Sequence, residues 1–219
     1  MVMKLEYQDE IAVLTLGDSE NRFTPEWLDS LDANLDEVED NARGLITVGV
    51  GKFYSNGLNL EWLRCDGERK DSYVGRVHDL LNRILIFPLP SVAAINGHAF
   101  GAGAMFALAH DYRIMREDRG YLCLPEVDIN VPFTPGMAAL VQAKLSPQAA
   151  MTAMTTGHRY GGTAAFAAGL VDGAATVDEL LETARGVLTP IVGKDRQTLQ
   201  TIKSTMFASV TSALRPARS

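Results

Sequence analysis

Residues 91–109 read SVAAINGHAFGAGAMFALA, and this stretch is the most informative part of the chain. Its first five residues, Ser91–Ile95, are apolar and partly β-branched, which is typical of a buried strand, and Ala104–Ala109 continue as an apolar helix. The glycines between them permit a sharp turn and a close approach of the backbone to a ligand. We therefore expect a helix to begin near Gly101. Its first N–H groups have no intrahelical acceptor and lie at the positive end of the helix dipole, so this turn is a candidate site for a developing negative charge.

Downstream of this helix, residues 124–133 read LPEVDINVPF and place Glu126 among apolar neighbours. An apolar environment disfavours the charged form of a carboxyl group and raises its pKa, as a group that takes up and returns a proton requires. For an isolated glutamate, a solvated surface position is the commoner alternative. Together the two stretches predict an oxyanion site that faces a carboxylate.

The composition indicates one compact domain with an appendage, because 219 residues with 47% apolar and 21% charged side chains are ordinary for a globular protein. The net charge of −7 argues against nucleic acid as a partner, since phosphate binding needs a basic field. No apolar run reaches the roughly 20 residues that span a membrane, and the N-terminus lacks the apolar segment of a signal peptide, so we expect a cytoplasmic protein. Cys65 and Cys123 form no disulfide pattern, and the four histidines lack metal-ligand spacing, so we expect structural thiols and no metal site.

The alternation of strand and helix patterns predicts an α/β fold whose strands are largely parallel. After residue 126 helical patterns dominate. We therefore expect an α/β core over residues 1–150 and a helical C-terminal region over residues 151–219. The patterns are, in chain order, a hairpin over 5–16, a helix opened by Thr24 and Pro25, a strand over 44–50, a helix over 73–86, a strand over 91–95, and C-terminal helices that start near Ser146, Thr163, Thr176 and Lys194, the last running to Leu214.

Two loops with small residues follow strands, at residues 53–60 and 95–103. Neither has the G-x-G-x-x-G order of a dinucleotide-binding loop or the G-K-[ST] of a phosphate-binding loop. Two interpretations remain open from these residues. Either the glycines only permit tight turns, or exposed backbone N–H groups of both loops converge on one point and form an oxyanion hole.

Four segments together resemble the motifs of one superfamily, in the same order and spacing over about residues 5–175. FYSNGLNL (53–60) resembles F-[SA]-x-G-x-D-L, INGHAFGAG (95–103) resembles I-N-G-x-A-x-G-G-G, HDYRIM (110–115) resembles C-D-x-x-[IV]-A, and PEV (125–127) resembles the start of P-E-x-x-[LI]-G. The chain therefore resembles the enoyl-CoA hydratase/isomerase, or crotonase, superfamily. This resemblance implies a crotonase-like ββα spiral core and an acyl-CoA thioester as the substrate.

The resemblance assigns the oxyanion hole to the backbone N–H groups of Leu58 and Ala102. Hydratases of the superfamily activate water with two glutamates, and here the first position is Met105 while the second is Glu126. A thioether cannot accept a proton from water, whereas one base and an oxyanion hole suffice to move a proton between two carbons. The resemblance therefore implies a Δ3,Δ2-enoyl-CoA isomerase with Glu126 as its catalytic residue. The chain looks especially similar to the short monofunctional isomerases of plants and related bacterial proteins.

Further residues take roles only through this resemblance. Asn59 stands where the superfamily usually has aspartate, and its role is left open. The resemblance also implies fatty acid β-oxidation, a homotrimer or hexamer whose contacts come from the C-terminal helices, and no cofactor apart from the CoA of the substrate. The expected substrate- and CoA-binding residues are Ser55, Asn56, Gly57, Asn59, Leu60, Gly101, Lys52 and Arg22, and the expected acyl pocket contains Met105 and Phe133.

Two alternatives to the isomerase remain open. The same scaffold carries other reactions, among them hydration by one glutamate, thioester hydrolysis and decarboxylation, which product analysis would separate. A protein that binds acyl-CoA without turning it over would also keep the fold. The methionine at position 105 mildly favours this second alternative, and retention of Glu126 argues against it.

Overall fold

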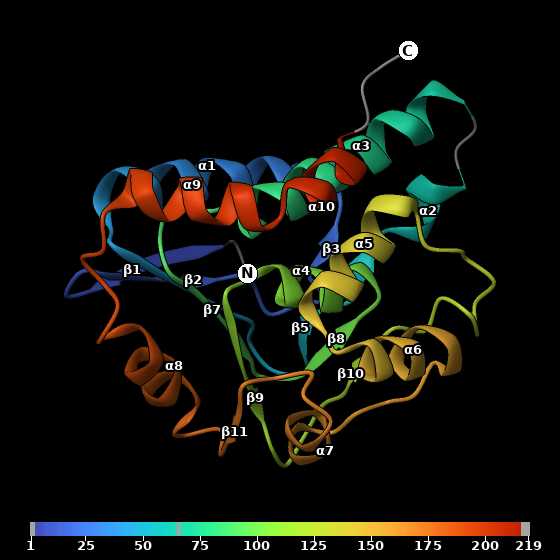
Figure 1. Ribbon diagram of the computed structural model, residues 1–219. Helices are drawn as coiled ribbons and strands as arrows, with labels where there is room; N and C mark the ends of the chain where they lie inside the picture. The colour runs from blue at the N-terminus through green and yellow to red at the C-terminus, as the bar shows by residue number, and fades with distance from the viewer. Residues whose placement is uncertain (1–2, 65–66, 216–219) are drawn as a thin grey trace.

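A six-stranded sheet forms the middle layer of the protein in the computed structural model, which describes residues 3–64 and 67–215 (Figure 1). Its strand order is β1-β2-β4-β7-β9-β11. The β1–β2 pair is antiparallel and the other four pairs are parallel, so the predicted α/β class with largely parallel strands is confirmed. The strands are β1 (Lys4–Gln8), β2 (Ile11–Thr15), β4 (Gly44–Val48), β7 (Ser91–Ile95), β9 (Tyr112–Arg116) and β11 (Gly173–Ala175).

The two faces of this sheet pack into two separate apolar clusters, because successive residues of a strand point to opposite faces. In β2, Ala12 and Leu14 belong to the larger cluster, whereas Ile11 and Val13 belong to the smaller one. Helix α8 (Leu180–Leu188) covers the smaller cluster with three buried side chains. The sheet is thus buried on both faces, as parallel sheets usually are.

Helix α1 (Pro25–Asn41) begins and packs as its sequence predicts. The Thr24 hydroxyl accepts a hydrogen bond from the Trp27 N–H at 3.2 Å, and proline occupies the first helical position. The apolar stripe of the helix is buried on the larger cluster. Helix α9 (Arg196–Met206) lies beside α1 on the outside of the molecule (Figure 1), and the Arg196 guanidinium donates to the Glu39 carbonyl there.

Two small sheets bring the motif loops together. Strands β5 (Phe53–Ser55), β8 (His98–Phe100) and β10 (Leu122–Cys123) pair in parallel, and β3 (Arg22–Phe23) pairs in parallel with β6 (Gly57–Leu58). Because parallel strands end at the same edge of a sheet, the residues that follow β5, β8 and β10 lie close together. The short helices α2 (Leu60–Leu63) and α4 (Ala102–Ala109) begin near that edge, and all residues of α4 are buried.

Several other elements differ from their predicted bounds. The helix predicted from Tyr73 begins five residues earlier, and two acidic side chains in its first turn favour that start. The helix expected at Thr176 begins four residues later, because a turn precedes it in which the Thr176 hydroxyl donates to Glu179 at 2.8 Å. The single helix expected over 194–214 is two helices that meet at Phe207, and neither α5 nor β11 was predicted. The remaining helices are α3 (Glu68–Leu85), α5 (Pro135–Lys144), α6 (Pro147–Thr156), α7 (Gly162–Ala167) and α10 (Ala208–Leu214).

The buried Lys203 fixes α9 to the core. Its ammonium group donates to the carbonyls of Phe87 and Leu89 at 2.9 and 3.0 Å and lies 2.7 Å from the Asp111 carboxylate. The residue is 5% exposed, and a charge buried to that degree requires such partners. This contact ties the C-terminal helices to the segment between α3 and β7.

Within the described residues, no helix combines the length and apolarity that crossing a membrane requires. Cys123 is buried with a free thiol, and burial raises the pKa of that thiol to about 11, so it has the properties expected of a structural cysteine. Cys65 lies outside the described residues.

Candidate active site

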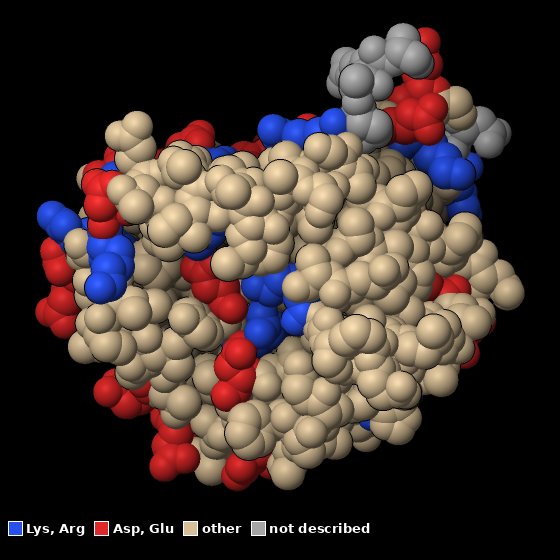
Figure 2. All heavy atoms as spheres, in the orientation of Figure 1, with Lys and Arg blue, Asp and Glu red and all other residues tan. Residues whose placement is uncertain are grey.

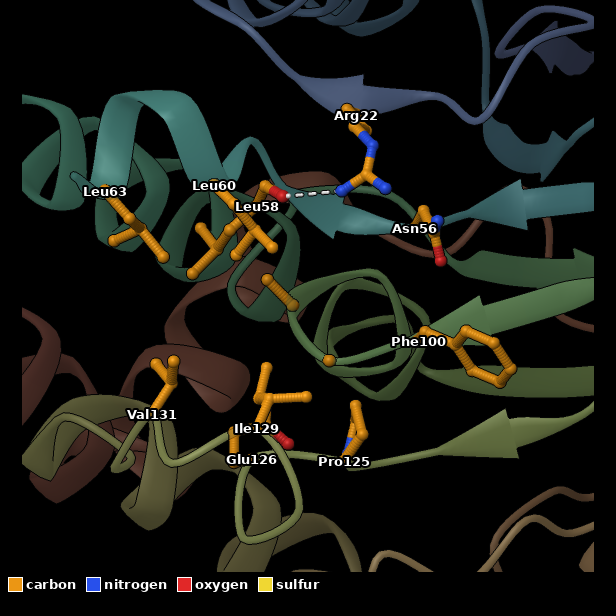
Figure 3. A pocket seen from close by; sticks show the side chains of 12 residues that line it. Arg22, Asn56, Leu58, Leu60, Leu63, Phe100, Pro125, Glu126, Ile129 and Val131 are labelled. Carbon is orange, nitrogen blue, oxygen red and sulfur yellow. Dashed lines mark hydrogen bonds between the residues drawn. The ribbon is translucent and has the colours of Figure 1, made fainter.

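A largely apolar cleft of about 180 Å³ lies where the two small sheets meet the loop after β10 (Figure 3). Leu63 and Val131 lie at one end of the cleft, and Asn56 and Phe100 lie at the other. Glu126 faces it from the loop and supplies the only carboxylate among the described residues that line it. Among the described residues, the cleft therefore has an apolar end, an opposite end that contains Asn56 and Phe100, and one acidic group between them.

Gly57 holds the loop of residues 55–58 against the first turn of α4. Its φ of +69° lies in the left-handed region, and a β-carbon there would stand 2.6 Å from the Gly103 nitrogen and 2.8 Å from the Ala102 nitrogen. The Ala102 N–H is the first of α4 and has no intrahelical acceptor. Leu58 follows Gly57 directly, and both Leu58 and Ala102 line the cleft. The structure thus brings together the two residues predicted to form an oxyanion hole.

Ser55 and Asn56 have different places in this loop. The Ser55 hydroxyl is buried, donates to the Asn21 carbonyl at 2.8 Å and accepts from the Gly57 N–H at 3.1 Å. It shapes the loop and is not part of the cleft lining. The Asn56 N–H donates to the Glu20 carbonyl at 2.8 Å, and the Asn56 side chain lies at the cleft (Figure 3).

Glu126 has the environment of a carboxyl group that exchanges protons near neutral pH. It is 8% exposed, and burial raises its pKa from 4.5 to about 7 although its own backbone N–H partly opposes the shift. A β-carbon at Gly101 would lie 3.2 Å from its Oε1, which places the carboxyl group beside the first turn of α4. Among the described residues its Oε2 has no hydrogen-bond partner. A buried acceptor without a partner is free to take a proton from a ligand in the cleft.

The two predicted phosphate-binding cations lie in different settings. Arg22 lines the cleft, but its guanidinium lies 2.5 Å from the Glu20 carboxylate and donates to the Leu58 carbonyl at 3.2 Å (Figure 3). Lys52 is exposed outside the cleft, with its ammonium nitrogen 5.2 Å from the centroid of the Phe53 ring. The positive charge of Arg22 is therefore already paired, whereas that of Lys52 faces solvent and an aromatic ring.

Of four further predicted residues, Leu60 lines the cleft, whereas Asn59, Met105 and Phe133 do not. Asn59 caps α2, because its side chain accepts from the N–H two residues further on at 2.9 Å, and Leu60 lines the cleft. Met105 is 1% exposed within the larger apolar cluster and is not part of the cleft lining. Phe133 lies outside this cleft and lines an adjoining cavity that shares Glu126 with it.

A buried hydrogen-bonded chain beneath the site was not found from the sequence. His110 Nδ1 lies 2.8 Å from the Phe106 carbonyl and must donate to it, so Nε2 accepts from the Thr47 hydroxyl at 2.9 Å, which in turn accepts from the Tyr54 hydroxyl at 2.7 Å. Burial lowers the pKa of His110 to about 3, so the ring is neutral. The chain joins α4 to β5 through β4. Its members are separated by up to 63 residues in sequence, and no local pattern marks them.

The family model for enoyl-CoA hydratase/isomerase matches residues 6–219. The chain belongs to this family. Within the enoyl-CoA hydratase/isomerase family, it is 41% identical over 180 residues to enoyl-CoA delta isomerase 3 of Arabidopsis thaliana. This alignment covers 78% of this chain and 76% of that protein. It is also 31% identical over 207 residues to a probable enoyl-CoA hydratase of Bacillus subtilis (strain 168), which covers 91% of this chain and 79% of that protein.

The crystal structure of human mitochondrial delta3-delta2-enoyl-CoA isomerase matches the fold with a TM-score of 0.89 at 23% sequence identity, over 98% of this chain and 86% of that one. The predicted crotonase-like fold is thus confirmed, and the protein is an enzyme of the enoyl-CoA hydratase/isomerase family. The described residues contain no group of three side chains that could hold a metal ion.

Proposed function

We propose that this enzyme is a Δ3,Δ2-enoyl-CoA isomerase that moves a double bond of an acyl-CoA thioester from C3 to C2. The observation that carries the proposal is that Glu126, beside the first turn of α4, is the only carboxylate among the described residues that line the cleft. Activation of water by two carboxylates would need a second carboxylate, and position 105 carries a methionine that is buried in the core. Moving a proton between two carbons needs one base only.

In the proposed reaction, the Glu126 carboxylate takes a proton from C2 of the 3-enoyl thioester. The electrons of the broken C–H bond pass into a dienolate, whose oxygen accepts hydrogen bonds from the N–H groups of Leu58 and Ala102. The protonated Glu126 then returns the proton to C4, which leaves the double bond between C2 and C3. A carboxyl group with a pKa of about 7 suits both steps, because it is ready to accept and to release a proton near neutral pH.

The apolar end of the cleft supports an acyl chain as the ligand. The cleft is lined by Leu60, Leu63, Ile129 and Val131, and an alkyl chain gains free energy by burial between such side chains. We propose that the reaction needs no cofactor apart from the CoA that the substrate carries, and that it serves fatty acid β-oxidation. The name of the Arabidopsis relative, an enoyl-CoA delta isomerase, supports the isomerase reaction.

We further propose that the enzyme assembles as a homotrimer or a hexamer of two trimers. The C-terminal helices expose large apolar side chains, and the face in Figure 2 shows wide areas without charged residues over these helices. Exposed apolar area of this kind is typical of protein interfaces. The exposed side chains are Met151, Phe166, Ile202 and Met206.

The test is turnover of a trans-3-enoyl-CoA and, separately, of a trans-2-enoyl-CoA by wild type, Glu126→Gln and the control Asp128→Asn. Asp128 is an exposed carboxylate of the same loop that does not line the cleft. We expect an isobaric 2-enoyl product, a loss of roughly a hundredfold or more in Glu126→Gln, and full activity in Asp128→Asn. A product heavier by one water would assign a hydratase instead, as the name of the Bacillus relative suggests.

A further inference from the structure

A second cavity, of about 340 Å³, lies between α9 and the segment that leads into β9, and we call it the lysine cavity. Among the described residues that line it, the charged ones are Lys144, Lys194, Lys203 and Asp111. Much of the remaining lining is apolar and comes from Leu199, Ile202, Met206 and Phe207. Figure 2 shows Lys and Arg side chains in the recess below α9, near the centre of the view. No described residue lines both this cavity and the active-site cleft.

Lys144 differs from Lys203 in how its ammonium group is paired. Each ammonium group has three N–H donors. Those of Lys203 are matched by two carbonyls and the Asp111 carboxylate. Lys144, the last residue of α5, donates to the His110 carbonyl at 2.8 Å, and its nitrogen lies 5.4 Å from the centroid of the Phe207 ring. Among the described residues it forms no ion pair with a carboxylate.

The charges around Lys144 are unbalanced toward the positive. Burial is the main reason that its pKa is lowered to about 8, and the charges of Arg113 and Lys203 act in the same direction. The carboxylates of Asp111 and Asp172 oppose the shift, but each is already paired, at 2.7 Å with Lys203 and at 2.6 Å with Arg113. Lys144 is therefore a cation that lacks both a counter-ion and hydrogen-bond acceptors.

A ligand with a carboxylate and an alkyl chain would supply what this cavity lacks. The carboxylate accepts hydrogen bonds from the Lys144 ammonium group and brings the missing negative charge. The alkyl chain gains free energy by burial against the apolar side of the cavity. We propose that the lysine cavity binds a short-chain fatty acid, with the carboxylate on Lys144 and the chain against Ile202, Met206 and Phe207. Because this site is separate from the cleft, it would bind the acid whatever reaction Glu126 catalyses.

The test is calorimetric titration of the full-length protein with acetate, butyrate, hexanoate and, as an uncharged probe, hexan-1-ol. We expect the affinity to rise from acetate to hexanoate, by up to about fourfold for each methylene group that becomes fully buried. Hexan-1-ol should bind at least about tenfold more weakly than hexanoate. At pH 8.5 the binding of hexanoate should take up about half a proton or more, because the carboxylate raises a lysine pKa that lies at about 8 in the free protein. Titrations in two buffers of different ionisation enthalpy measure this uptake.

Two variants assign the binding to this cavity. Lys144→Met should bind hexanoate at least about tenfold more weakly than wild type and should take up no proton. It should remain folded, because the His110 carbonyl still accepts from the Arg113 guanidinium at 3.2 Å, and thermal unfolding checks this. The matched control is Lys4→Met, which removes an exposed lysine that pairs with Glu6 and should leave the affinity for hexanoate unchanged. If Lys144→Met did not fold, the comparison of hexanoate with hexan-1-ol and the proton uptake of wild type would still decide.

Each contrary outcome overturns the fatty acid site. Wild type that bound no hexanoate, or that bound hexan-1-ol equally well, would do so, and so would a folded Lys144→Met with unchanged affinity. Ile202 and Met206 also belong to the surface proposed above for subunit contacts, so binding is measured on the assembled protein and its mass is recorded by light scattering. An assembly that bound no hexanoate and dissociated in Lys144→Met would assign the cavity to a second copy of the chain instead.

Discussion

Replacing Glu126 with glutamine should change how the stability of the protein depends on pH. Folding leaves 8% of this residue exposed, and burial raises its pKa from 4.5 to about 7. Between these two values the folded protein holds a proton that the unfolded chain releases, so the free energy of unfolding falls as the pH rises through this window. Below this pH window Glu126 is protonated in both the folded and the unfolded state, and no stability is lost. Above it the loss is complete and amounts to about 3 kcal/mol.

Glutamine cannot ionise, so Glu126→Gln should escape this loss. The assay is urea unfolding of wild type, Glu126→Gln and Asp128→Asn at intervals from pH 4.5 to pH 8.5. The stability of Glu126→Gln relative to wild type should rise by about 3 kcal/mol across this range and then level off. The curve of Asp128→Asn should run parallel to that of wild type. A difference between Glu126→Gln and wild type that stayed constant with pH would refute the reasoning, whatever reaction the enzyme catalyses.

Three further substitutions test the framework of the site. Gly57→Ala should lower both activity and stability, because φ at this position is +69° and the added carbon would stand 2.8 Å from the Ala102 nitrogen. We expect the free energy of unfolding in urea to fall by about 1–3 kcal/mol. A variant as stable and active as wild type would contradict this prediction. Lys203→Met should cost about 3–5 kcal/mol, since it removes the cation beside the Asp111 carboxylate, and a cost under 1 kcal/mol would show that the contact is dispensable. Thr47→Val should cost about 1–3 kcal/mol by leaving two buried polar groups unpaired, and Thr47→Ser should restore most of it in the same assay.

Much of the fold could be read from local sequence, because the relevant physics acts between near neighbours. Thr24 and Pro25 set the start of α1, and Ser146 caps α6 in the same way. Other elements depend on distant partners. Strand β11 is three residues of glycine and alanine that carry no strong strand signal, and it forms because β9 offers an unpaired edge. The break between α9 and α10 at Phe207 has no glycine or proline to announce it.

The chemistry of the site likewise depends partly on the sequence itself and partly on contacts between distant segments. The chemical groups can be listed from the sequence alone: a carboxyl group at 126, a thioether at 105 and small residues at 57 and 101. The properties of the charged groups, however, depend on the folded structure around them. The raised pKa of Glu126 comes from burial by segments remote in sequence, and the charge of Lys203 is paired because the fold brings it beside Asp111, 92 residues away in sequence. Desolvation and charge pairing are properties of the surroundings, and a residue acquires its surroundings only when the chain has folded.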